Sequence, residues 1–133
     1  MTNKKVKLPT DRLPVIRVVA MPKDTNPGGS IFGGWLMSQI DIAAAIPALE
    51  RAKGRVATVA VNSMEFHEPV FVGDIISCYA DIVKTGHTSI TVKVEVYSER
   101  NPSDKQIVKV TEAELTYVAL DENRRPRELP DID

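Results

Sequence analysis

The hydrophobic period of this chain changes at Gly54, and this change constrains the fold more than any other feature. Before it, apolar residues recur at helical spacing over residues 31–53, after Ser30, a candidate N-cap. After it, four stretches have the period of two that is typical of strands: 56–66, 75–83, 89–98 and 107–120. A β-branched run at 15–21 precedes the helix. The sequence therefore predicts a strand, a long helix that ends near Gly54 as its C′ residue, and four further strands.

Pro47 lies inside the predicted helix, where proline costs about 3 kcal/mol. We therefore expect a kink there or an earlier helix end. Short connections such as Thr85-Gly86-His87 indicate hairpins, which favours a mostly antiparallel sheet with a helix on one face, an α+β fold. One helix cannot cover both faces of the sheet, so we expect a second subunit to cover the apolar residues of the other face. These residues are Val59, Val61, Ile76, Ile82, Val108 and Val110.

Composition excludes several classes of protein. The 133 residues suit one domain, and 17 Lys and Arg against 18 Asp and Glu argue against a nucleic-acid-binding protein. The single Cys78 excludes an intrachain disulfide framework and a cysteine zinc site. No apolar stretch is long enough to span a membrane, and no apolar run follows the basic N-terminus as in a signal peptide. We expect a soluble, cytoplasmic protein without a metal, with flexible ends at residues 1–12 and 125–133.

Four of the seven glycines surround the predicted helix start: Gly28, Gly29, Gly33 and Gly34. Glycine lets a ligand or another backbone approach closely. The first N–H groups of a helix have no internal partners and carry the positive end of its dipole. Such a site can stabilise an anion or a polarised carbonyl oxygen. The alternative is a tight, closely packed loop without a ligand.

Asp41 is an acidic residue in the middle of an otherwise apolar helix, and its neighbours three and four positions away are Met37, Ser38, Ala44 and Ala45. A carboxylate on such a face either pairs with a buried donor or serves chemistry, as a general base or a nucleophile. The structural alternative is a carboxylate held by backbone N–H groups or by an arginine of a neighbouring subunit. Asn26, in the loop before the helix, is by itself an ordinary turn residue.

Residues 20–41, AMPKDTNPGGSIFGGWLMSQID, closely resemble the YciA-like acyl-CoA thioesterases of the hotdog fold. The similarity continues through 54–56, 64–66, 86–90 and 113–117. The resemblance implies one hotdog domain over residues 1–133, with a five-stranded antiparallel sheet wrapped around one long helix. It also implies a homo-oligomer, at least a double-hotdog dimer and commonly a trimer of dimers.

The resemblance further implies hydrolysis of acyl-CoA to a fatty acid and CoA. Asp41 is then the general base or nucleophile, and Asn26 orients the water or the carbonyl. The N–H groups of Gly34 and Gly33 polarise the thioester carbonyl. In this fold the site lies at the dimer interface, so we expect Asn26 and Asp41 of one site to come from different subunits. No cofactor is expected, because CoA is part of the substrate, and neither nucleic acid nor a membrane is an expected partner.

For CoA itself we expect the pantetheine to follow the strand at Thr58, Val59, Ala60, Val61, Asn62 and Ser63. Ala60 departs from family members that carry a larger, basic residue there. Candidates for binding the nucleotide phosphates are Lys84, Gly86, Thr88, Ser89 and Arg125. Acyl-chain preference depends on how Trp35, Met37 and Phe66 pack. Two other functions stay open: a non-catalytic acyl-CoA-binding sensor or regulator, and a hotdog dehydratase. The dehydratase is the weaker, because no histidine lies between Asn26 and Asp41.

Overall fold

The computed structural model describes residues 6–132. The elements follow the predicted order, and a short 3₁₀ turn, η1, adds to it. They are β1 (Ile16–Val19), η1 (Pro22–Asp24), α1 (Gly33–Ala52), β2 (Val56–Phe66), β3 (Ile75–Thr85), β4 (Ser89–Arg100) and β5 (Gln106–Ala119). No predicted strand or helix boundary differs from the structure by more than two residues. Residues 1–5 and 133 of the expected flexible ends lie outside the described residues.

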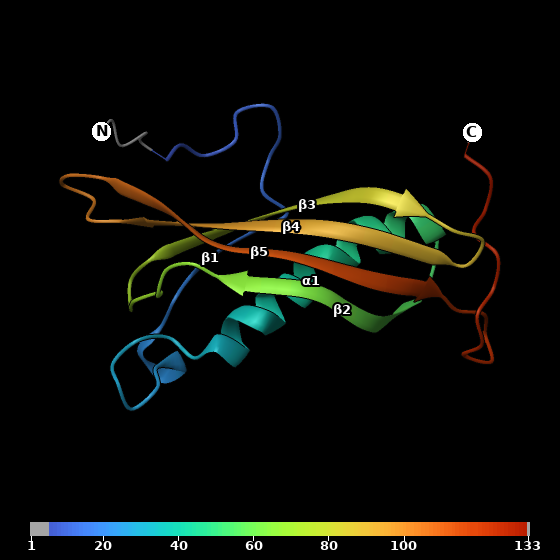
Figure 1. Ribbon diagram of the computed structural model, residues 1–133, viewed down its shortest axis with the longest axis horizontal. Helices are drawn as coiled ribbons and strands as arrows, with labels where there is room; N and C mark the ends of the chain where they lie inside the picture. Colours follow the sequence, from blue (N-terminus) through green and yellow to red (C-terminus); the bar gives the residue numbers. More distant parts are fainter. Residues whose placement is uncertain (1–5, 133) are drawn as a thin grey trace.

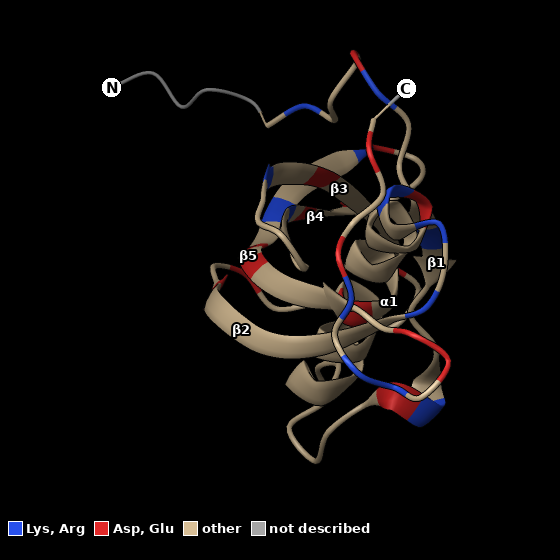
Figure 2. Ribbon diagram, turned by 90° about the vertical axis from the view of Figure 1, so that its right-hand side faces the viewer, with Lys and Arg blue, Asp and Glu red and all other residues tan. Residues whose placement is uncertain are grey.

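The five strands form one antiparallel sheet in the order β1-β3-β4-β5-β2. Helix α1 lies along one face of this sheet (Figure 1). Viewed end-on, the strands curve around the helix from β1 to β2 (Figure 2). The predicted α+β fold, a five-stranded antiparallel sheet wrapped around one long helix, is therefore confirmed. β2 is an edge strand, so its outer edge has no partner strand among the described residues.

The core lies between α1 and the inner face of the sheet. Helix residues Leu36 and Ile40 are buried together with a run of alanines, which lets the helix lie close to the strands. Four alternate residues of β4 are fully buried beneath them: Ile90, Val92, Val94 and Val96.

The sequence assigned six apolar residues to the uncovered face, but Ile76 and Val110 belong to this core and Val108 packs against it. Val61 and Ile82 pair with the buried Leu115 and Val92 and therefore share their face. The prediction was wrong for these five residues.

The outer face of the sheet is charged rather than apolar in its centre. Arg12 pairs with Asp81 (3.1 Å) and with Glu95 (2.9 Å), and Lys109 also pairs with Glu95 (3.0 Å). Arg12 therefore ties the chain before β1 to the sheet, within a segment that was expected to be flexible. The exposed apolar side chains of the sheet include Val59 and Val61 of the edge strand β2, which are each at least half exposed.

Both ends of α1 differ from the sequence-based expectation. The helix runs through Pro47 to Ala52, so the earlier end is excluded. Its N-cap is Phe32, whose side chain has no atom that could accept a hydrogen bond, and the hydroxyl of Ser30, the expected cap, accepts from Asn26 instead. At the other end Lys53, rather than a glycine, has a left-handed backbone with φ of 52°.

Gly54 makes room for Arg127, since a Cβ at Gly54 would lie 2.9 Å from Nη2 of that arginine. Nη2 of Arg127 donates to the carbonyl of Ala52 at the helix end (2.7 Å), and Nε donates to the carbonyl of Leu120 (2.9 Å). The N–H of Leu129 donates to the carbonyl of His87 (2.8 Å). These bonds hold the segment after β5 against the fold, where the sequence predicted a flexible end.

Candidate active site

The carboxylate of Asp41 lies where the middle of α1 meets β2 and β5. Oγ1 of Thr58 donates to Oδ1 of Asp41 at 2.7 Å, and the Tyr117 hydroxyl lies 2.6 Å from the same oxygen. Strand register explains why both donors meet there, because Thr58 of β2 pairs with Tyr117 of β5. Within residues 6–132, Asp41 is bonded neither to backbone N–H groups nor to an arginine, and Oδ2 makes no hydrogen bond.

Tyr117 received no role from the sequence, although it makes the shortest hydrogen bond to Asp41. Only 1% of it is exposed. Burial raises the pKa of Tyr117 above its usual range, and the hydrogen bond to Asp41 raises it further. The phenol therefore stays protonated and acts as a donor. Strand alternation could have placed Tyr117 on the helix face, but its meeting with Asp41 depends on the pairing of β2 with β5.

The start of α1 is open at Gly33 and Gly34. Within residues 6–132, the first helical N–H that has an acceptor is that of Leu36, which donates to the carbonyl of Phe32 (3.3 Å). A Cβ on either glycine would meet no atom within 4 Å. The packed-loop alternative is therefore not supported at these two positions. A Cβ on Gly29 would likewise meet no atom within 4 Å, but the left-handed backbone there, with φ of 93°, favours glycine.

Asn26 closes the loop that precedes the helix. Its Nδ2 donates to Oγ of Ser30 (3.1 Å), and its Oδ1 accepts from the Ser30 N–H (3.2 Å). Its backbone N–H donates to the Ser30 carbonyl (2.7 Å). These bonds fit the turn role that the sequence gave to Asn26 taken alone. They also fix the position of its amide beside the start of α1.

Asp41 and the helix start lie apart within one chain. Asp41 follows Gly34 by seven residues, which is roughly 10 Å along a helix that rises 1.5 Å per residue. The Gly34 N–H and the Asp41 carboxylate of the same chain are therefore too far apart to contact one thioester group together. Of the predicted catalytic residues, Asn26, Gly33 and Gly34 gather at the helix start, and Asp41 lies with Thr58.

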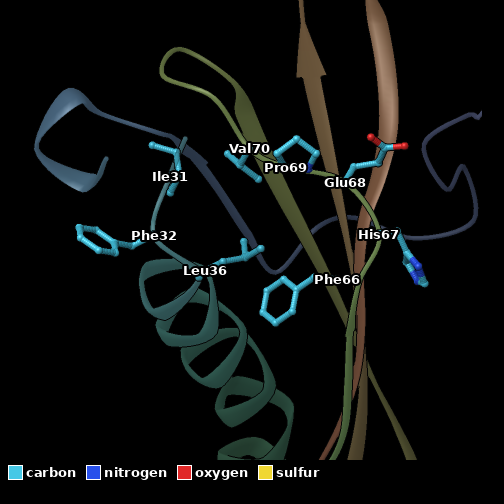
Figure 3. A pocket seen from close by; sticks show the side chains of 9 residues that line it. Ile31, Phe32, Leu36, Phe66, His67, Glu68, Pro69 and Val70 are labelled. Atoms are coloured by element: carbon cyan, nitrogen blue, oxygen red, sulfur yellow. The ribbon is translucent and has the colours of Figure 1, made fainter. Parts of the chain in front are cut away.

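A pocket of about 290 Å³ lies beside the helix start. Ile31, Phe32, Gly33 and Leu36 line one side, and residues 66–70 at the end of β2 line the other. Figure 3 shows Leu36 and Phe66 pointing toward each other in this pocket, whereas His67 and Glu68 point away from it. Of the three residues expected to influence chain preference, Phe66 lines the pocket, and Trp35 and Met37 do not.

The predicted pantetheine strand does not present its side chains to one surface. Thr58 faces α1, whereas Nδ2 of Asn62 donates to Oγ1 of Thr116 (2.8 Å) on the outer face. Two register shifts interrupt the pairing of β2 with β5, between Thr58 and Ala60 and between Val61 and Ser63. The side chains of Val59, Ala60, Val61, Asn62 and Ser63 are all exposed.

The predicted phosphate-binding residues gather at the opposite end of the sheet from the helix start (Figure 1). Lys84, Gly86, Thr88 and Ser89 belong to the β3–β4 hairpin, in which the Gly86 N–H donates to the Ser89 carbonyl (2.9 Å). Arg125 lies in the turn after β5, where its backbone N–H donates to Oδ1 of Asp121 (3.0 Å). The two turns are adjacent, because the Ala119 N–H at the end of β5 donates to the Thr88 carbonyl.

Two features are absent from residues 6–132. No group of three or more His, Cys, Asp and Glu side chains there could hold a metal ion. Over the same residues, none of the helices combines the length and the apolarity that crossing a membrane requires.

Comparisons with known proteins identify the family of this chain and agree with its fold. The family model of the thioesterase superfamily matches residues 28–105. The acyl-CoA thioester hydrolase YciA of Salmonella typhimurium is 53% identical over 118 residues, 87% of this chain and 89% of that protein. A hexameric hotdog fold thioesterase of Campylobacter jejuni, Cj0915, has a TM-score of 0.87 at 44% identity and covers 92% of this chain and 93% of that one. The hexameric thioesterase y2039 from Yersinia pestis has a TM-score of 0.85 at 53% identity, over 94% of this chain and all of that one. This chain belongs to the thioesterase superfamily and has its hotdog fold.

Proposed function

We propose that this protein is an acyl-CoA thioester hydrolase that releases a free fatty acid and CoA, with Asp41 as its reacting carboxylate. The observation that carries this proposal is the arrangement of hydroxyl donors around Asp41. Thr58 and Tyr117 both approach Oδ1, which leaves Oδ2 available to a water molecule or a substrate. The YciA relative, named as an acyl-CoA thioester hydrolase, supports the same reaction.

The chemistry is hydrolysis at the thioester carbonyl. In one route, Oδ2 of Asp41 accepts a proton from water as the water oxygen attacks the carbonyl carbon. In the other, the carboxylate attacks and forms an anhydride, which water then cleaves. In both routes the carbon–sulfur bond breaks, and the CoA thiolate leaves and takes up a proton. The N–H groups of Gly34 and Gly33 stabilise the negative charge that develops on the carbonyl oxygen.

Each site is shared between two subunits in this proposal. The separation of roughly 10 Å along α1 argues that the thioester contacts Asn26 and the helix start of one subunit and Asp41 of its partner. The outer edge of β2 pairs with no other strand of residues 6–132, and this edge with its exposed Val59 and Val61 supplies a surface for that partner. Since the C. jejuni and Y. pestis thioesterases are hexameric, we propose a homo-oligomer built from dimers, and a trimer of dimers as its assembly.

The proposal also includes binding sites for the two parts of CoA. The pantetheine runs along residues 58–63, and the phosphates bind at the hairpin and turn that carry Lys84, Gly86, Thr88, Ser89 and Arg125. The reaction needs no resident cofactor, because CoA belongs to the substrate. We also propose a cytoplasmic location, which is compatible with the single, unpaired Cys78.

The test is thiol release from acyl-CoAs ranging from acetyl to palmitoyl. Wild type is compared with Asp41→Asn and with Asp104→Asn, a control in the exposed turn between β4 and β5. We expect turnover by wild type and by the control, and a loss of about 10²–10⁴-fold in Asp41→Asn.

Two results would contradict the proposal. Saturable binding of acyl-CoA to the wild type in calorimetry, without thiol release, would favour the sensor. Full turnover by a folded, oligomeric Asp41→Asn protein would show that the reacting group lies elsewhere.

A further inference from the structure

Tyr117 is a polar side chain in the middle of an apolar surface. It lies on the inner face of β5 between Leu115 and Ala119, and all three are at least 99% buried. A phenylalanine would fill the same volume without a hydroxyl that needs a partner. A buried hydroxyl without a hydrogen bond is costly, so the presence of tyrosine there calls for a specific acceptor.

Asp41 supplies that acceptor. The Tyr117 hydroxyl lies 2.6 Å from Oδ1 of Asp41 and 2.8 Å from the Asp41 backbone carbonyl. Because one hydroxyl contacts both the carboxylate and the backbone carbonyl of Asp41, it restricts rotation about the side-chain bonds of Asp41. A hydrogen bond to an ionised acceptor is short and strong, which matches the 2.6 Å distance.

The second donor to Oδ1 differs from Tyr117 in its surroundings. Thr58 lies on the edge strand β2 and is exposed, so water competes for its hydroxyl. Tyr117 is buried, and its ring is held by the packed core around it. The tyrosine is therefore the donor better suited to hold the carboxylate in one orientation.

We infer that Tyr117 is a positioning residue that holds Oδ1 of Asp41, so that Oδ2 points to the reacting water or thioester carbonyl. This inference rests on the proposed function, because it assigns Tyr117 a role in the reaction of Asp41. It also explains why an exposed threonine and a buried tyrosine converge on one oxygen, while the other makes no hydrogen bond to any of residues 6–132.

The test replaces Tyr117 by phenylalanine, which removes only the hydroxyl. The matched control is Tyr97→Phe, since Tyr97 is also buried and its hydroxyl donates to a carboxylate, that of Glu95 (3.1 Å), on the outer face of the sheet. We expect Tyr117→Phe to keep its oligomeric state and to lose about 10- to 100-fold in kcat, with KM little changed, because an orienting hydrogen bond to a carboxylate is lost. Tyr97→Phe should keep its kcat.

A second comparison separates positioning from a purely structural role. If Tyr117 acts through Asp41, the double variant Asp41→Asn/Tyr117→Phe has the kcat of Asp41→Asn alone. A structural role predicts a lower melting temperature for Tyr117→Phe and independent effects in the double variant. Unchanged kcat in Tyr117→Phe, or independent effects, would overturn the inference.

Two further outcomes are decided by the same assay. If Tyr117→Phe does not assemble, Thr58→Val removes the other hydrogen bond to Oδ1. Because Tyr117 remains, kcat is expected to stay above a tenth of the wild-type value, whatever change in KM follows from the place of Thr58 on the pantetheine strand. A loss in Thr58→Val as large as that in Asp41→Asn would assign the orienting role to Thr58 and overturn the inference. A wild type without thiol release would refute the proposed function together with the inference, whereas an active wild type with an equally active Tyr117→Phe refutes only the inference.

Discussion

Two inactive variants of this protein should restore each other's activity when they are assembled together. The reasoning depends on the separation of roughly 10 Å between the Gly34 N–H and Asp41 along α1. If each site takes Asn26 from one subunit and Asp41 from the other, a mixed dimer of Asn26→Ala and Asp41→Asn has one site with both defects. The other site of that dimer has neither defect. If both residues of a site came from one subunit, no intact site would form.

The expected magnitude follows from random pairing. Equal amounts of the two variants give mixed dimers in about half of all pairs, and each mixed dimer holds one intact site of two. About a quarter of wild-type kcat is therefore expected per subunit. The assay is thiol release after co-expression at equal levels, with each variant also measured alone.

A control establishes that the subunits mix. Wild type co-expressed with Asp41→Asn should retain about half of wild-type kcat, whichever subunit supplies Asn26, because half of the carboxylates are intact. If this control gives half while the two inactive variants together give only the sum of their separate activities, a site shared between subunits is refuted.

Two further substitutions test other parts of the structure. Gly34→Ala adds a Cβ that meets no atom of its own chain within 4 Å and favours the helix by about 1 kcal/mol. We therefore expect an unchanged or higher melting temperature. We also expect a loss of about 10²-fold in kcat/KM, because the methyl group keeps the thioester carbonyl away from the N–H groups. Unchanged kcat/KM would contradict an oxyanion site at the start of α1. Arg127→Ala removes the bonds to the carbonyls of Ala52 and Leu120 and should lower the free energy of unfolding in urea by about 2–3 kcal/mol. Arg125 is an exposed neighbour, and Arg125→Ala should change the free energy of unfolding by less than about 0.5 kcal/mol. Equal effects of the two substitutions would show that the hydrogen bonds of Arg127 do not stabilise the end of α1.

The sequence predicted those parts of the fold that depend on local periodicity. The change of period at Gly54 separated the helix from the four later strands, because an apolar face repeats every 3.6 residues in a helix and every two in a strand. Local capping rules were less successful. Ser30 was expected to cap α1, but its hydroxyl is bonded to Asn26. Gly54 was expected to have the left-handed backbone, but Lys53 has it, and Gly54 instead makes room for Arg127, which is 73 residues away in the sequence.

The candidate site shows why local patterns could find Asp41 and not its partners. Asp41 can be recognised from the sequence because it is an acidic residue in an otherwise apolar helix. Its donors, Thr58 and Tyr117, lie on two strands, and they can be identified only when the pairing of those strands is known. A regular strand would place Thr58 and Val61 on opposite faces, because they are three residues apart. In the structure they pair with Tyr117 and Leu115 respectively, which lie on the same inner face, and a register shift between Thr58 and Ala60 makes this possible. Thr58 itself lies in the regular register that precedes the shift, so its alignment with Tyr117 on one carboxylate oxygen depends on that register, and the shift reorients the residues after it. A substitution that made this pairing regular would turn residues beyond the shift to the other face, even with every site residue retained.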